Sequence, residues 1–145
     1  MKLFLSNADY LGNFQSFLKN LDLNNLDFLE ITTHEKWVNV HPAILTMIVA
    51  LSKVVSPSKI TVDKITARSG HYLDRMGLFK AIGEKSPYSI IKHEPAGRFI
   101  PLTQIKTQDE QTKFITDMIP LLHLDPQQSD AIKYTVGELI RNVLE

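Results

Sequence analysis

The feature that most constrains this chain is the alternation of short apolar runs with amphipathic segments through its first half. Strand-like runs occupy residues 2–6, 26–32 and 59–66. Apolar residues at three- and four-residue spacing predict helices over 9–21, 42–55 and 70–78. Because strands that alternate with helices are joined by crossovers, this order favours a mainly parallel sheet.

The second half of the chain predicts a different arrangement. Two further strands are expected at 87–91 and 99–105, followed by helices at about 108–122 and 126–144. The residues expected to be buried are Phe114, Ile115, Met118, Ile119 and Leu122 in the first of these helices, and Ile132, Val136, Leu139, Ile140 and Val143 in the second. We therefore predict an α/β fold, with a small mainly parallel sheet and helices in residues 1–95 and a strand plus two helices in residues 96–145.

Charge and residue usage exclude several functional classes. Sixteen basic residues balance sixteen acidic ones, so no net positive charge supports general binding to nucleic-acid phosphates. The absence of cysteine excludes disulfides and thiolate metal sites. The most apolar stretch, 43–51, is about half the length of a membrane-spanning helix. We expect a cytoplasmic protein that binds neither nucleic acid nor a membrane.

Residues 26–82 combine this element order with the run Leu-Asp-Arg-Met-Gly-Leu-Phe at 73–79. Together they resemble the STAS-like family, the sulfate-transporter and anti-sigma-factor-antagonist domains. The resemblance implies a regulatory domain of bacterial signalling that binds a protein partner.

The segment 37–45 occupies the place where regulatory members of that family carry a strand, a switch loop and a helix. Those members often present a phosphorylatable serine at the start of the helix, whereas this loop has no serine or threonine. The partner-binding residues that we expect here are Trp37, Asn39, His41 and Pro42. Trp37 can serve either as a core residue or as an exposed anchor.

The C-terminal run 134–145 is similar to the first ATP-site helix of the histidine-kinase-like (GHKL) ATPases. The resemblance implies that Glu138 polarises water and that Asn142 ligates Mg²⁺. The alternative is that these two residues lie on a solvated helix face. No Asp-x-Gly-x-Gly segment or glycine-rich lid follows in the sequence. We therefore expect no cofactor for these residues, and ATP with Mg²⁺ only for a longer protein.

Other patterns of catalytic residues are incomplete. The five histidines lack metal-ligand spacing, so no metal site is expected. Ser69 and His71 lack the Gly-x-Ser-x-Gly turn of a hydrolase, so no catalytic residue is assigned.

Three functions are compatible with these patterns. The leading prediction is a non-catalytic regulatory protein–protein interaction module at the N-terminus of a larger bacterial signalling regulator. The alternative is the N-terminal fragment of a GHKL-type ATPase or serine protein kinase of the anti-sigma type. A third is a structural subunit that forms a homodimer through its C-terminal helices.

Overall fold

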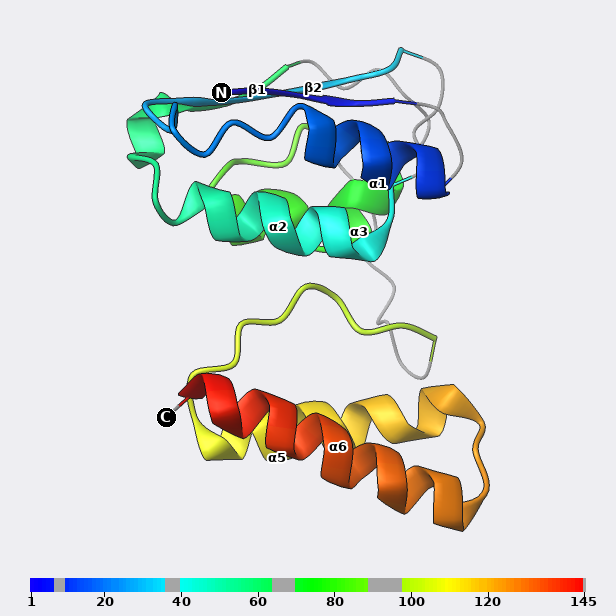
Figure 1. Cartoon of the computed structure of the whole chain (residues 1–145). Coiled ribbons are helices and arrows are strands. Elements are labelled where there is room, and N and C mark those ends of the chain that lie inside the picture. The colour runs from blue at the N-terminus through cyan, green and yellow to red at the C-terminus, as the bar shows by residue number, and fades with distance from the viewer. Residues whose placement is uncertain (7–9, 36–39, 64–69, 89–97, 145) are drawn as a thin grey trace. The chain divides into compact units, whose positions relative to one another are not determined.

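A computed structural model of the chain describes residues 1–6, 10–35, 40–63, 70–88 and 98–144. The chain divides into two compact units, Met1–Lys92 and His93–Glu145, which we describe separately (Figure 1). The predicted boundary between residues 95 and 96 lies outside the described residues.

The first unit is built on a three-stranded sheet. Strands β1 (Lys2–Leu5), β2 (Leu29–Thr33) and β3 (Ile60–Val62) lie in the order β1-β2-β3, and both neighbouring pairs are parallel. This arrangement confirms the predicted α/β class and the mainly parallel sheet.

The helices of this unit lie on one side of the sheet (Figure 1). They are α1 (Tyr10–Lys19), α2 (Pro42–Ser52), α3 (Gly70–Arg75) and α4 (Leu78–Ile82), with a short 3-10 turn, η1 (Pro57–Lys59), before β3. The core forms where the helices meet the sheet. Its most buried side chains are Leu3, Leu29, Ile31, Val40, Ile44, Leu45, Ile48, Leu73, Leu78 and Phe79.

Residues 70–82 form two helices, whereas the sequence pattern predicted one helix over 70–78. The break falls at Gly77, whose φ of 80° is left-handed. A left-handed residue cannot continue a right-handed helix, and glycine adopts this conformation without a Cβ clash. The chain therefore turns after α3 and starts again as α4.

The second unit is a helical hairpin. Helix α5 (Gln108–Met118) continues into the 3-10 turn η2 (Ile119–Leu122), and α6 (Pro126–Leu144) returns beside α5 (Figure 1). The side chain of Thr107 and that of Glu110 form a reciprocal capping box at the start of α5. Asp125 caps α6 as predicted, since its carboxylate accepts the N–H of Gln128 at 2.9 Å.

The predicted strand at 99–105 is wrong. These residues form neither helix nor strand. Pro101 removes a backbone donor from the middle of the segment, and no strand in the described part of the chain pairs with it. Of the other predicted strand, 87–91, residues 87 and 88 are not in a strand, and 89–91 lie outside the described residues.

The buried face of α6 also differs from the prediction. Gly137 is buried against α5, where the side-chain amide of Gln111 donates to its carbonyl at 2.6 Å. A Cβ added at Gly137 would lie 3.6 Å from Ile115. Because the small residues of α6 allow close approach to α5, the predicted core residues Ile132, Leu139 and Val143 are exposed.

Candidate interaction surface

One face of the parallel sheet is not covered by the described helices (Figure 1). We call it the open face. Alternation along the strands and the residues just after them gives its members: Lys2, Phe4, Ser6, Glu30, Thr32, His34, Thr61 and Asp63. None of these residues is buried. In contrast, Leu3, Leu5, Leu29, Ile31 and Ile60 of the opposite face are all buried.

The strand register arranges the open face in rows. Lys2 aligns with Glu30, and Glu30 aligns with Thr61 on the third strand. Phe4 aligns with Thr32 in the next row. The hydrogen bonds from the N–H of His34 to Leu5 and from the N–H of Asp63 to Ile31 extend this register past the strand ends.

A face that the described helices leave uncovered is unusual for an all-parallel sheet, because both faces of such sheets are normally covered by helices. Among the eight residues named above only Phe4 is apolar; its side chain is 49% exposed and lies on the edge strand β1. A large aromatic group surrounded by hydrogen-bonding groups is typical of an interaction surface.

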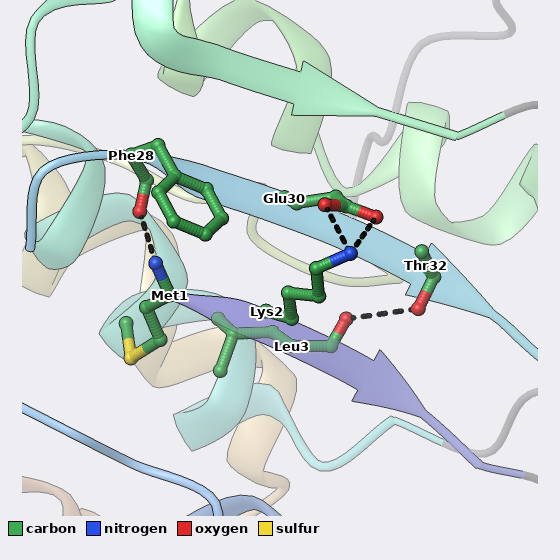
Figure 2. Close-up of polar contacts among 6 residues, drawn as sticks. All are labelled: Met1, Lys2, Leu3, Phe28, Glu30 and Thr32. Atoms are coloured by element: carbon green, nitrogen blue, oxygen red, sulfur yellow. Dashed lines mark hydrogen bonds and ion pairs between the residues drawn. The ribbon is translucent and has the colours of Figure 1, made fainter. Parts of the chain in front are cut away.

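Polar side chains of the open face are held by contacts between β1 and β2 (Figure 2). The Lys2 ammonium lies 3.0 Å from one Glu30 carboxylate oxygen and 3.3 Å from the other. The Thr32 hydroxyl donates to the Leu3 carbonyl at 3.3 Å. Exposed ion pairs add little stability, about 0.2–1 kcal/mol. Their main effect is to hold one positive and one negative group side by side on the open face.

The start of β1 is also anchored to β2. The Met1 ammonium donates to the Phe28 carbonyl at 2.6 Å, and the N–H of Glu30 donates to the Met1 carbonyl at 2.9 Å (Figure 2). The Met1 side chain is buried. The first strand is therefore held from its first residue, which keeps Phe4 in register with Thr32.

All three strands are parallel, so their carboxyl ends lie at the same edge of the sheet, which we call the carboxyl edge. The polar residues that follow the strands include Ser6, His34, Glu35 and Asp63. The predicted partner-binding segment follows β2 and begins α2, so Pro42 stands at this edge and is exposed. Trp37 and Asn39 lie outside the described residues.

His41 has a structural role at the same edge of the sheet. Its Nδ1 accepts the N–H of Ala43 at 3.1 Å, which makes it the N-cap of α2, and Pro42 occupies the first turn. The His41 ring also lies against Phe14 of α1, with 5.6 Å between ring centroids. Any effect of His41 on a partner is therefore combined with an effect on α2.

A second cluster joins the end of the first unit to α3. The Tyr88 ring lies 4.7 Å from that of His71 and 6.1 Å from that of Phe79, centroid to centroid. A side chain at Gly70 would overlap the Tyr88 hydroxyl. Burial raises the pKa of the Tyr88 hydroxyl, and the negative charge of the buried Asp74 raises this pKa further. The cluster packs the segment that follows α4 against α3.

The predicted nucleotide-binding pair lies on α6. Glu138 is half-buried and forms an ion pair with Arg141, whereas Asn142 is exposed one turn later. Within the described residues, no group of three or more His, Asp or Glu side chains is arranged to hold a metal ion. No described helix is both long enough and apolar enough to cross a membrane.

Comparisons with known proteins return no match: no protein-family model, no curated protein and no solved structure matches this chain. The case for a function therefore depends on the surface described above.

The open face was not among the sequence predictions. Residues 26–32 were interpreted as a compact apolar run that suits a central strand. The signal that identifies the face is the alternation of Glu30 and Thr32 with Leu29 and Ile31. Alternation in β1, where Lys2 and Phe4 are exposed and Leu3 and Leu5 are buried, indicates the same one-sided burial.

Proposed function

We propose that this chain is a cytoplasmic regulatory module that binds a protein partner through the open face and the neighbouring carboxyl edge of its sheet. It acts by binding, without catalysis of its own. The observation that carries the proposal is the exposed Phe4 among the polar residues of the open face, on the edge strand β1 of an all-parallel sheet.

The chemistry of the open face defines the partner. Phe4 offers an apolar anchor, and burying an aromatic ring of this kind is a common source of binding energy. Lys2 and Glu30 present both signs of charge side by side. A matching partner therefore places an apolar side chain over Phe4 and supplies both a donor and an acceptor beside it.

The size of the surface favours a reversible complex. The three strands are short, with four, five and three residues. Small, partly polar interfaces are typical of transient signalling contacts rather than permanent assemblies. This agrees with the regulatory role that the STAS-like resemblance implies. Under this proposal the residues Trp37, Asn39, His41 and Pro42 of the segment 37–42 also contact the partner.

Site-specific photo-crosslinking in the source cells tests the proposal. A photoreactive phenylalanine analogue is placed at Phe4 in one variant of the full chain and at Val54 in a control variant. Val54 is an apolar residue that is 66% exposed, outside the open face. We expect a discrete adduct with one protein from position 4 and none of the same mass from position 54.

The crosslinked protein is then identified, purified and titrated against the full chain. Phe4→Ala should weaken its binding at least about tenfold, since loss of an aromatic anchor residue costs about 2 kcal/mol or more. Val54→Ala should leave the affinity unchanged. Identical adducts at both positions, or equal affinity of the Phe4→Ala and wild-type chains, would refute the proposed function.

The second candidate function is nucleotide binding in a longer protein of the GHKL type. It is favoured by the four-residue spacing of Glu138 and Asn142 on α6, the spacing for which the family resemblance was noted. For the chain of 145 residues alone we expect no ATP binding in the presence of Mg²⁺. Saturable binding that Asn142→Ala abolishes, while Thr135→Ala on the same helix does not, would favour this candidate instead.

A further inference from the structure

Helix α6 carries an apolar stripe that its own hairpin leaves largely uncovered. We call Ile132, Val136, Leu139 and Val143 the outer stripe. Val143 is 83% exposed, Leu139 is 62% exposed and Ile132 is 37% exposed, whereas Val136 is half-buried beside α5. Contiguous apolar groups of this kind mark an interaction site more often than scattered single residues do.

The orientation of α6 in the hairpin explains why the stripe faces outward. The bond from Gln111 to the Gly137 carbonyl and the burial of Ser129 bring the small residues of α6 against α5. At about 100° per residue, the outer stripe lies beside that face and not on it. Burying the stripe within the hairpin would require α6 to rotate and to lose its buried hydrogen bond to α5.

Most charged residues of α6 lie away from the stripe. The charged side chains of α6 form two ion pairs, Lys133 with Asp130 and Arg141 with Glu138. At helical spacing Asp130, Glu138 and Arg141 lie at least about 100° around the helix from every residue of the stripe, whereas Lys133 lies about 60° from Val136 and is paired with Asp130. The flank of the stripe away from α5 carries the uncharged residues Gln128, Thr135 and Asn142. A partner could therefore cover the stripe without burying a charge.

The stripe has a spacing that matches itself in reverse. Its residues follow one another after four, three and four positions, so the order is the same from either end. Spacing of this kind is that of a helix-pairing seam. In an antiparallel pair, Ile132 of one copy meets the partner's Val143, and Val136 meets the partner's Leu139.

We propose that the outer stripe is a self-association surface, on which α6 of a second copy packs antiparallel to form a four-helix bundle with both α5 helices. The match of apolar residues across a two-fold axis and the absence of charge from the contact favour a second copy. The proposal is independent of the partner expected at the open face.

The interface should be weak, because four side chains cover far less than the roughly 800 Å² that each partner of a stable complex buries. We expect a dissociation constant of about 10 μM or higher, which a concentration series up to several hundred μM would detect.

Analytical ultracentrifugation of the full chain over such a series tests the proposal. The wild-type chain should shift from monomer to dimer with concentration. Leu139→Glu should weaken dimerisation at least about tenfold, because it places a charge in the centre of the seam. Tyr134→Glu is the matched control, since Tyr134 is also a large exposed residue of α6 but lies on another face. Circular dichroism establishes that both variants remain helical.

Disulfide trapping tests the orientation, and the absence of native cysteine makes it unambiguous. An equal mixture of the variants I132C and V143C should form mixed disulfide dimers, whereas each variant alone should form few. A wild-type chain that stays monomeric throughout the series overturns the proposal. In that case a loss of monomer stability in Leu139→Glu would show that the stripe packs within one chain. Trapping of like with like overturns the antiparallel arrangement.

Discussion

Replacing His41 should destabilise the first unit before it affects any partner. His41 caps α2 through the hydrogen bond that its Nδ1 accepts from the N–H of Ala43. His41→Ala leaves this N–H without its partner and also removes the contact with the Phe14 ring. The result would be a less stable helix next to the edge at which binding is proposed.

The size of this effect follows from the cap. Loss of a side-chain N-cap costs about 1 kcal/mol, within a range of roughly 0.5–2 kcal/mol. For a domain the size of Met1–Lys92, a change of that size lowers the melting temperature by about 4–8 °C. His41→Asn supplies another side-chain acceptor that is favoured at N-caps. It should recover most of the loss.

Fluorescence offers an assay that reports on the first unit. Trp37 is the chain's single tryptophan and belongs to that unit, so its emission during heating or urea denaturation monitors the unfolding of Met1–Lys92. Wild-type, His41→Ala and His41→Asn chains would be compared under the same conditions. Equal melting temperatures for wild type and His41→Ala, or equal losses in the alanine and asparagine variants, would refute the capping argument. Partner binding should then be compared between wild type and His41→Asn.

Two further predictions concern the Tyr88 cluster and the start of α5. Gly70→Ala should cost about 1–3 kcal/mol through overlap with the Tyr88 ring, as measured by urea denaturation, and the cost should largely vanish when Tyr88→Ala is already present. The pKa of Glu110 is lowered from its ordinary value of 4.5, first by the hydrogen bond from the Lys106 N–H and then by the bond from the Thr107 N–H. Its contribution to the stability of the hairpin is therefore complete above the unfolded pKa and is lost as pH falls through the lower folded pKa. Glu110→Gln should flatten the acid dependence of hairpin stability below about pH 4.5, followed by circular dichroism, and an unchanged acid profile would contradict this.

Local patterns predicted most elements of the fold. The bounds of α6, Pro126–Leu144, were predicted as observed, because Asp125 and Pro126 define its start and apolar spacing continues along it. The three strands and their parallel pairing followed from alternation with helices. The predicted helix was expected to end at the turn-forming Gly77 or soon after, but the second helix, α4, was missed, because a glycine near the end of an apolar pattern is compatible with either a helix end or a turn between two helices.

The faces of the elements were predicted less well than their positions. In α6, hydrophobicity predicted that Ile132, Leu139 and Val143 are buried. The helix instead packs with Gly137 toward α5, since close backbone approach and the Gln111 hydrogen bond determine its orientation. In the sheet, alternation along β1 and β2 indicates one-sided burial, but only the register shows that Phe4 lies beside Thr32.

The sequence by itself determined the class of the fold, the order of the strands and helices through β3, and the cap of α6. These depend on residues that are close along the chain, through helical or strand periodicity and through side chains that bond to nearby backbone groups. Only the tertiary structure decided which sheet face lacks a covering helix and which stripe of α6 faces solvent. Both depend on contacts between segments far apart in sequence, such as β1 with β2 and Gln111 with Gly137. Local patterning cannot specify those contacts, because the same apolar residue can cover a neighbour in its own chain or remain exposed for a partner.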